Sequence, residues 1–251
     1  MEGTSTRVGM TVDPEPYLNA LVIAASFAVG LPILRKSRAA RDRPAMLLAA
    51  ALLIDGLEWV LWSFYLYWPE SESWISDASA VACRVGIDAA VVCLGLFTWK
   101  TFHREDRLAA IAFWLALGAL LSGFLGSGVL GDWRGFRADH PWIWLEVIAQ
   151  ISVAAWVGAA PALYYRRLRK RIAIGLADPV VANKFALWAI YGASYCAVQI
   201  LFAVALAWQQ DYLTLDPISI ALTLAGTGAL WLAFFPPGPY QAWLRGGAAQ
   251  R

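Results

Sequence analysis

Five ionisable residues lie inside apolar stretches of this sequence: Asp55, Glu58, Arg84, Asp88 and Glu146. Charged groups in such surroundings are costly, and they usually serve binding, proton transfer or pairing with one another. Asp55 and Glu58 are three residues apart and Arg84 and Asp88 are four apart, so each pair shares one face of a helix. One arginine cannot neutralise four carboxylates, so some carboxyl groups must be protonated, hydrated or bound to a ligand. This surplus of acid predicts a site for a proton or a small cationic solute.

Other polar side chains occur at the same helical spacing. Glu146 and Gln150 are four residues apart, and so share a helix face. An aromatic and polar stripe with steps of three, four and four residues is formed by Trp188, Tyr191, Tyr195 and Gln199. The last apolar stretch carries a hydroxyl stripe formed by Ser219, Thr223 and Thr227. We expect these faces to converge.

A depth estimate places four of these side chains in one layer. At a rise of 1.5 Å per residue, they lie roughly 12 to 15 Å below the outer membrane boundary; they are Glu58, Asp88, Gln150 and Gln199. Arg84 and Glu146 lie above this layer, and Asp55 lies below it. We therefore predict a polar cavity that opens to the outside and is flanked by Tyr191 and Tyr195. Its other ligand-binding or proton-binding residues would be Asp55, Glu58, Arg84, Asp88, Glu146, Gln150 and Gln199.

A structural role for the same residues is the alternative. Arg84 would then bridge Asp88 or Glu58 and tie the second apolar stretch to the third. Glutamine and threonine side chains often join membrane helices through hydrogen bonds worth about 0.6 kcal/mol each. The sequence leaves both the binding site and the structural network open.

Seven apolar stretches must position these residues. Hydrophobic residues make up 60% of the chain and charged residues 15%, whereas charged residues make up about 25% of soluble domains. A membrane-spanning helix needs about 20 mostly apolar residues, and only helices and closed barrels satisfy their backbone in hydrocarbon. The stretches lack the alternation of barrel strands, so we predict an all-α bundle of seven transmembrane helices. The predicted spans are 17–34, 45–68, 79–102, 108–130, 142–165, 185–208 and 217–235.

The distribution of basic residues predicts the orientation of the bundle. Of 20 Lys and Arg residues, 16 fall on one side of the predicted spans, three fall on the other, and Arg84 lies inside a span. An excess of Lys and Arg marks the cytoplasmic side. We therefore expect an extracytoplasmic segment at 1–16, a transmembrane domain at 17–235 and a short cytoplasmic tail at 236–251. The Ala- and Arg-rich composition suggests a bacterial plasma (inner) membrane.

The first three and the last three spans share some landmarks. Pro32 and Pro161 each precede a basic segment, and Trp68 and Trp208 each end a span before acidic residues. These matches suggest a parallel repeat of three helices on each side of a fourth, linking helix, a plan that some transporters use. Sorting of basic residues to one side would by itself produce half of the matches, so the repeat is one of two readings.

The fourth span carries small residues instead of ionisable ones. Gly118, Ser122 and Gly126 follow one another at intervals of four residues. Small residues at this spacing let two membrane helices approach closely. We predict that this ridge is a helix-packing face.

Seven helices with an outer N-terminus, and Trp188 and Tyr191 in the sixth span, resemble the architecture of the microbial rhodopsins. That family binds retinal through a lysine of the last helix, so the resemblance implies such a lysine here. The seventh span of this chain contains no lysine. A retinal Schiff base is therefore excluded, and we predict no cofactor.

The first 70 or so residues are similar to the small membrane lycopene cyclases. The similarity lies in the order of Tyr17-Leu18, Pro32, a basic loop, Asp55 and Trp62-Ser63-Phe64. That family's Pro-x-Glu-Glu element is replaced here by Pro69-Glu70-Ser71-Glu72. The resemblance implies an enzyme acting on an isoprenoid or carotenoid, with Asp55 or Glu58 as a general acid.

Motifs of soluble enzymes and of metal sites are missing from the sequence. It contains no phosphate-binding glycine loop and no nucleophile elbow. The three cysteines lie inside predicted spans without metal-binding spacing, and His103 and His140 fall in loops on opposite sides. We therefore assign no metal site and no catalytic residue. Nucleic acid is not an expected partner, because the basic residues adjoin the membrane.

We interpret the chain as a sensor or transport module that binds a small solute, with a cationic one as an option, or a proton in the outer half of the bundle. A function other than catalysis is favoured. The alternatives are a membrane enzyme acting on an isoprenoid lipid and a non-catalytic subunit of a larger membrane complex. Besides the lipid bilayer, we consider a cytoplasmic or membrane protein partner, with the basic segment from Arg166 to Lys184 as its docking point.

Overall fold

The computed structural model of the protein describes residues 15–67, 74–130, 140–208 and 216–249, and these residues form helices and no strands. The helices are α1 (Glu15–Ala40), α2 (Arg43–Tyr67), α3 (Trp74–Phe102), α4 (Arg107–Leu130), α5 (Pro141–Ile172), α6 (Pro179–Trp208), α7 (Asp216–Phe234) and α8 (Gly238–Ala249). Seven of them, α1 to α7, are long and apolar enough to cross a membrane. The predicted all-α fold with seven transmembrane-length helices is therefore confirmed.

Several helices are longer than the apolar stretches that predicted them. α1 continues to Ala40, α5 continues to Ile172, and α6 already begins at Pro179. The added turns of α1 and α5 are rich in Arg and Lys, which are good helix formers. Their long side chains can reach polar surroundings while the backbone stays helical. The predicted basic loop from Arg166 to Lys184 is consequently mostly helix, with a short connection at 173–178.

Aspartates start three helices at the end of the bundle that carries the basic residues. The Oδ1 atom of Asp42 accepts a hydrogen bond from the Ala45 amide at 3.2 Å, and Asp106 and Asp178 accept similar bonds at the starts of α4 and α6. Such caps satisfy amide groups that have no partner inside the helix. They allow the connections between consecutive helices to stay short.

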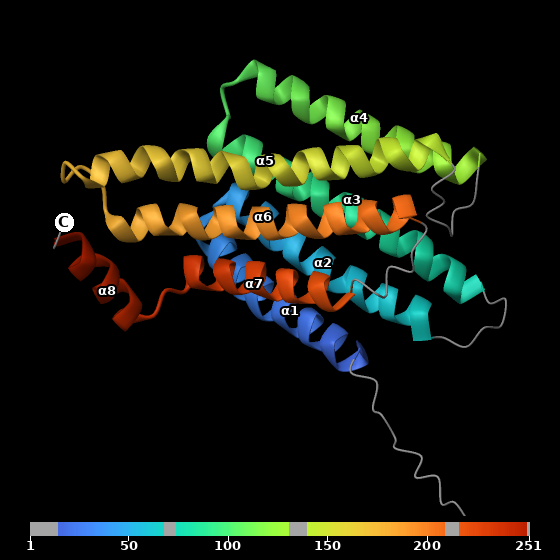
Figure 1. The fold of residues 1–251 in the computed structure, drawn as a ribbon, viewed down its shortest axis with the longest axis horizontal. Coiled ribbons are helices and arrows are strands. Elements are labelled where there is room, and N and C mark those ends of the chain that lie inside the picture. The colour runs from blue at the N-terminus through green and yellow to red at the C-terminus, as the bar shows by residue number, and fades with distance from the viewer. Residues whose placement is uncertain (1–14, 68–73, 131–139, 209–215, 250–251) are drawn as a thin grey trace, which may run out of the picture.

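The seven long helices alternate in direction (Figure 1). α1, α3, α5 and α7 terminate, and α2, α4 and α6 begin, at what we call the basic end, which lies on the left in Figure 1. Most of the Lys and Arg residues of the chain lie there. Which end faces the cytoplasm stays a prediction, as does the parallel repeat.

Six helices close into a ring and the seventh stays outside it. α1 packs against α2, α2 against α3, α3 against α5, α5 against α6, α6 against α7, and α7 against α1. α4 packs on the outside of this ring against α5 and α3 (Figure 1). Its other face is an apolar surface that includes Leu115, Leu121 and Val129. The interior of the ring is thus bounded by α1, α2, α3, α5, α6 and α7.

The helix α8 was not predicted. Pro236 and Pro237 end α7, because proline lacks the amide hydrogen that a helix requires. The chain then resumes a helix that packs against α6, where the Asn183 amide donates a hydrogen bond to the Tyr240 hydroxyl at 2.8 Å. Trp243 of α8 remains exposed. The segment after the last span is therefore an ordered helix at the basic end.

Candidate functional site

A cavity of about 90 Å³ lies inside the ring of helices, in the half of the bundle away from the basic end. Residues of α2, α3, α5, α6 and α7 line it. They are Glu58, Trp59, Trp62, Ile87, Gln150, Tyr195, Val198, Gln199, Phe202 and Thr223. Helices that are far apart in the sequence thus contribute both polar and apolar side chains to one cavity.

Four of the predicted site residues line this cavity: Glu58, Gln150, Tyr195 and Gln199. They come from α2, α5 and α6, and Thr223 of the predicted hydroxyl stripe joins them from α7. The expected convergence of these faces is therefore present in the structure. Whether the cavity binds a ligand stays a prediction.

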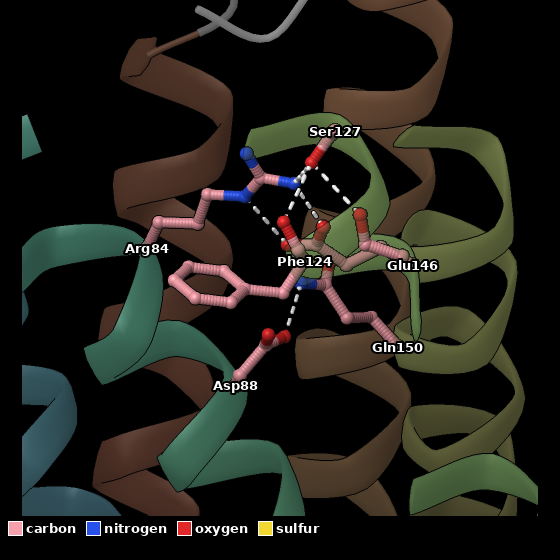
Figure 2. A network of polar contacts seen from close by, with 7 residues as sticks. Arg84, Asp88, Phe124, Ser127, Glu146 and Gln150 are labelled. Carbon is pink, nitrogen blue, oxygen red and sulfur yellow. Dashed lines mark hydrogen bonds and ion pairs between the residues drawn. The ribbon is translucent and has the colours of Figure 1, made fainter. Parts of the chain in front are cut away.

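Asp88 reaches the cavity wall through Gln150. The Gln150 Nε2 atom donates a hydrogen bond to Asp88 Oδ1 at 2.9 Å, which connects α3 to α5 (Figure 2). Of the three carboxyl groups Asp55, Glu58 and Asp88, only that of Glu58 lines the cavity itself.

Arg84 forms an ion pair with Glu146, and not with Asp88 or Glu58 as the structural alternative supposed. Its Nε atom donates to Glu146 Oε1 at 2.9 Å, and its second guanidinium nitrogen contacts both Glu146 Oε2 and the Ser127 hydroxyl (Figure 2). Arg84 is 2% exposed and Glu146 is fully buried. Neither residue lines the cavity, so their prediction as lining residues is not met. The pair instead ties α3, α4 and α5 together.

Glycines let α4 come close enough to complete this pair. A Cβ atom on Gly123 would lie 2.7 Å from the Glu146 Cβ atom, and one on Gly126 would lie 2.3 Å from the Trp142 ring. Both distances are shorter than real Cβ contacts, so only glycine fits. The predicted ridge was wrong in part: Gly118 has open space around it and Ser122 is exposed. The packing face contains Gly126 but continues through Gly123 and Ser127.

Asp55 and Tyr191 lie beside the cavity without lining it. Asp55 accepts a hydrogen bond from the Ser26 hydroxyl of α1 at 3.3 Å. Tyr191 is buried in the apolar core, and its ring stacks on that of Tyr195 with 6.3 Å between centroids. Asp55 therefore connects α2 to α1, and Tyr191 supports Tyr195 from the core side.

The polar groups of the cavity wall include several hydrogen-bond acceptors. One N–H of the Gln150 amide is donated to Asp88, which leaves the second N–H and the carbonyl oxygen of this amide for other partners. The Thr223 hydroxyl donates to the Ser219 carbonyl oxygen at 2.9 Å, so its lone pairs remain. Glu58 Oε1 is 3.4 Å from the thiol of Cys83, which is a weak donor. Such a wall suits a ligand that is positively charged or donates hydrogen bonds.

Trp188, the first member of the predicted stripe, lies away from the cavity. It packs in an aromatic cluster toward the basic end, with ring centroids 5.2 Å from Phe97, 5.3 Å from Phe185 and 5.8 Å from Phe234. Lys184, at the start of α6, lies over the rings of Trp188 and Phe234. We call Phe97, Phe102, Phe185, Trp188 and Phe234 the inner aromatic cluster. It fills the bundle on the side of the cavity that faces the basic end.

Sequence reasoning missed the aromatic part of the cavity wall. Trp59, Trp62 and Phe202 line the cavity beside the predicted polar residues. Their position could have been inferred, because Trp62 is four residues after Glu58 and Phe202 is three after Gln199. Ser127 was missed for a different reason: α4 carries no ionisable residue between its ends, and nothing in its pattern singled out that face.

Among the residues that the structure describes, no group of three or more His, Cys, Asp or Glu side chains is placed to hold a metal ion. Comparisons with known proteins add no family assignment. No protein-family model matches the sequence, and no curated protein or solved structure is significantly similar to it. The resemblances to rhodopsins and to lycopene cyclases therefore rest on the residues that suggested them. What the fold supports is a helical bundle that is compatible with an integral membrane protein and contains a small cavity.

Proposed function

We propose that the protein is a membrane sensor or transport module that binds a small cation or a proton in the cavity beside Glu58. The observation that carries this proposal is the imbalance of charge around the cavity. Arg84, the one basic residue inside a predicted span, is paired with Glu146. In the described part of the chain, no Lys or Arg forms an ion pair with Asp55, Glu58 or Asp88.

The cost of these acidic groups favours a function over a structural role. An acidic side chain at the centre of a membrane-spanning helix costs about 2.5 to 3.5 kcal/mol in insertion experiments. A hydrogen bond between membrane helices returns about 0.6 kcal/mol on average. The bonds of Asp55 to Ser26 and of Asp88 to Gln150 would not offset that cost if the groups were only structural. Binding of a cation or a proton would account for the presence of these acidic groups.

The inner aromatic cluster bears on how such binding is used. Trp188 lies 11 residues from Gln199 along α6, which is roughly 16 Å of helix. A cation in the cavity would have to pass rings packed at 5.2 to 5.8 Å to reach the basic end. A transporter must open this cluster, whereas a sensor needs only to change its packing. Flux measurements separate these two cases.

The isoprenoid-enzyme alternative gains no support from the cavity. Pockets for drug-sized ligands occupy about 300 to 1,000 Å³, and the cavity beside Glu58 has about 90 Å³. Asp55, the other acid proposed for that chemistry, does not line it. The alternative of a subunit in a larger complex rests on no particular observation, and we do not develop it.

Cation binding by purified protein in nanodiscs tests the proposal. A ligand present at 100 times its Kd stabilises a protein by about 2.7 kcal/mol, so the unfolding temperature should rise when sodium, potassium, methylammonium or trimethylammonium chloride is titrated. We expect one of these cations, or an imposed proton gradient in proteoliposomes, to give a response that Glu58→Gln abolishes. This substitution keeps the size of the side chain and an oxygen that can accept from Cys83.

Glu105→Gln is the matched control, because Glu105 is an exposed carboxylate between α3 and α4. It should bind and transport as the wild type does. If Glu58→Gln behaves like Glu105→Gln in every assay, the cavity is not the site and the proposal is wrong. Binding with flux would identify a transporter, and binding without flux would identify a sensor.

A further inference from the structure

The wall of the cavity joins one carboxyl group to an unusual number of aromatic rings. Trp59 and Trp62 follow Glu58 on α2, and Tyr195 and Phe202 face them from α6. Trp59 is buried beneath the cavity, and Trp62 is partly exposed. Four of the ten lining residues are therefore aromatic. Inorganic cations and organic cations would experience such a wall differently.

We propose that the cavity selects a small alkylammonium ion, such as methylammonium or trimethylammonium, over inorganic cations. This inference rests on the proposed function and names the class of its ligand. The charge would be balanced by Glu58, and the alkyl groups would lie against the rings of Trp62, Tyr195 and Trp59. Aromatic faces attract cations through the negative potential of their π electrons, and assemblies of such rings recognise methylated ammonium groups.

The proportion of lining residues without oxygen argues against calcium and magnesium. Calcium takes six to eight oxygen ligands, and magnesium requires a nearly ideal octahedron of them. Five of the ten lining residues carry no side-chain oxygen: Trp59, Trp62, Ile87, Val198 and Phe202. An ion that needs a complete oxygen shell would keep an open side toward these groups. An alkylammonium ion presents carbon to the same groups and loses little.

The acceptor groups match the remaining part of such an ion. An ammonium group that carries hydrogen atoms donates hydrogen bonds, and the wall offers the Glu58 carboxylate and the carbonyl oxygen of Gln150. The volume limits the ligand to a small one, because about 90 Å³ is well below the roughly 300 to 1,000 Å³ of pockets for drug-sized ligands. We expect methylammonium and trimethylammonium to fit, whereas choline, with its added hydroxyethyl arm, should bind more weakly.

Replacing Trp62 tests the role of the rings, since this ring lines the cavity and is partly exposed. Trimethylammonium, methylammonium, choline and sodium chlorides are titrated at equal ionic strength into protein in nanodiscs, with calorimetry as the readout. We expect Trp62→Leu to weaken trimethylammonium binding by about threefold to thirtyfold and Trp62→Phe to weaken it less. Trp114→Leu is the control, because Trp114 lies on the exposed face of α4 and outside the cavity.

The outcomes separate this inference from the proposed function. Sodium binding or proton flux that depends on Glu58, together with no alkylammonium binding, would overturn the inference and leave the proposed function standing. Failure of every cation to bind, with no proton flux, would overturn both. An equal loss of sodium and trimethylammonium binding in Trp62→Leu would show that the ring supports the fold and does not select the ligand. Preference for choline over trimethylammonium would contradict the size argument.

Discussion

The ion pair of Arg84 and Glu146 shows how one residue's choice of partner shapes the rest of the bundle. Both side chains are buried, and the guanidinium group reaches Glu146 and Ser127 on two different helices. Because Arg84 is committed to this pair, Asp88 has the amide of Gln150 as its hydrogen-bond donor. The acidic character of the region beside the cavity follows from that commitment.

Breaking this pair from one side should be more damaging than removing it altogether. Removing one partner of a buried pair leaves an uncompensated charge and costs about 3 to 5 kcal/mol, whereas replacing both by apolar residues is often nearly neutral. We therefore expect Arg84→Met and Glu146→Leu each to lower the unfolding temperature strongly. The double variant should lie closer to the wild type when unfolding is followed in detergent.

Lys100→Met provides the comparison for these variants, because it removes an exposed cation from the same helix. It should change stability little. A loss of stability in the double variant equal to the sum of the two single losses would mean that the two side chains act independently, and the pair would then not be the link between α3 and α5.

For individual residues, the sequence predicted which side chains come together in the bundle more successfully than it predicted which of them form ion pairs. Spacing and depth brought Glu58, Gln150 and Gln199 to one cavity, because the rise of a helix is fixed. The partner of Arg84 could not be predicted in the same way. The depth estimate placed Arg84 and Glu146 together above Glu58 and Asp88, but the long Arg84 side chain could reach either level, and the choice of partner depends on the rotation of neighbouring helices.

At the scale of helices, α4 is the element whose position the sequence concealed. Soluble helices reveal their buried side through an apolar stripe. α4 is apolar on all sides, since lipid tails are as apolar as the side chains of a protein core. Length and composition therefore predicted that α4 is one of the seven transmembrane helices, but they did not predict its place outside the ring. Small residues occur both on the face of α4 that packs against α5 and on a face that does not, so their spacing alone could not identify the packing face.

Alanine substitutions at Gly123 and Gly118 test which face of α4 packs against the bundle. A methyl group on Gly123 would lie 2.7 Å from the Glu146 Cβ atom and 2.8 Å from the Glu146 amide nitrogen. We expect Gly123→Ala to move α4 away from α5, to weaken the contacts of Ser127 and Arg84, and to destabilise the protein by about 1 to 3 kcal/mol.

Gly118→Ala should instead stabilise the protein. Nothing lies within 4 Å of a Cβ atom at that position, and alanine favours a helix over glycine by about 1 kcal/mol. Thermal unfolding of both variants in one detergent decides the matter. If Gly118→Ala is the more damaging of the two, α4 packs through the face that the spacing of Gly118, Ser122 and Gly126 first suggested.

For the whole molecule, the distribution of charge decides which compartment the cavity serves. The basic residues and the inner aromatic cluster lie at one end, and the cavity lies nearer to the other. The described connections between α1 and α2, between α3 and α4, and between α5 and α6 all lie at the basic end (Figure 1). A bundle with its basic end in the cytoplasm would offer the cavity to extracytoplasmic solutes.

Labelling of single cysteines in intact cells tests this orientation. In a background where Cys83, Cys93 and Cys196 are replaced, Trp74→Cys places a thiol at the exposed start of α3 and Glu105→Cys places one at the basic end. We expect a membrane-impermeant maleimide to label position 74 in intact cells and position 105 only after lysis. The physical reason is that translocating the clustered basic residues across the membrane is unfavourable. The reverse pattern would turn the cavity toward the cytoplasm, so that a cytoplasmic cation would become its ligand while the chemistry of its wall stayed the same.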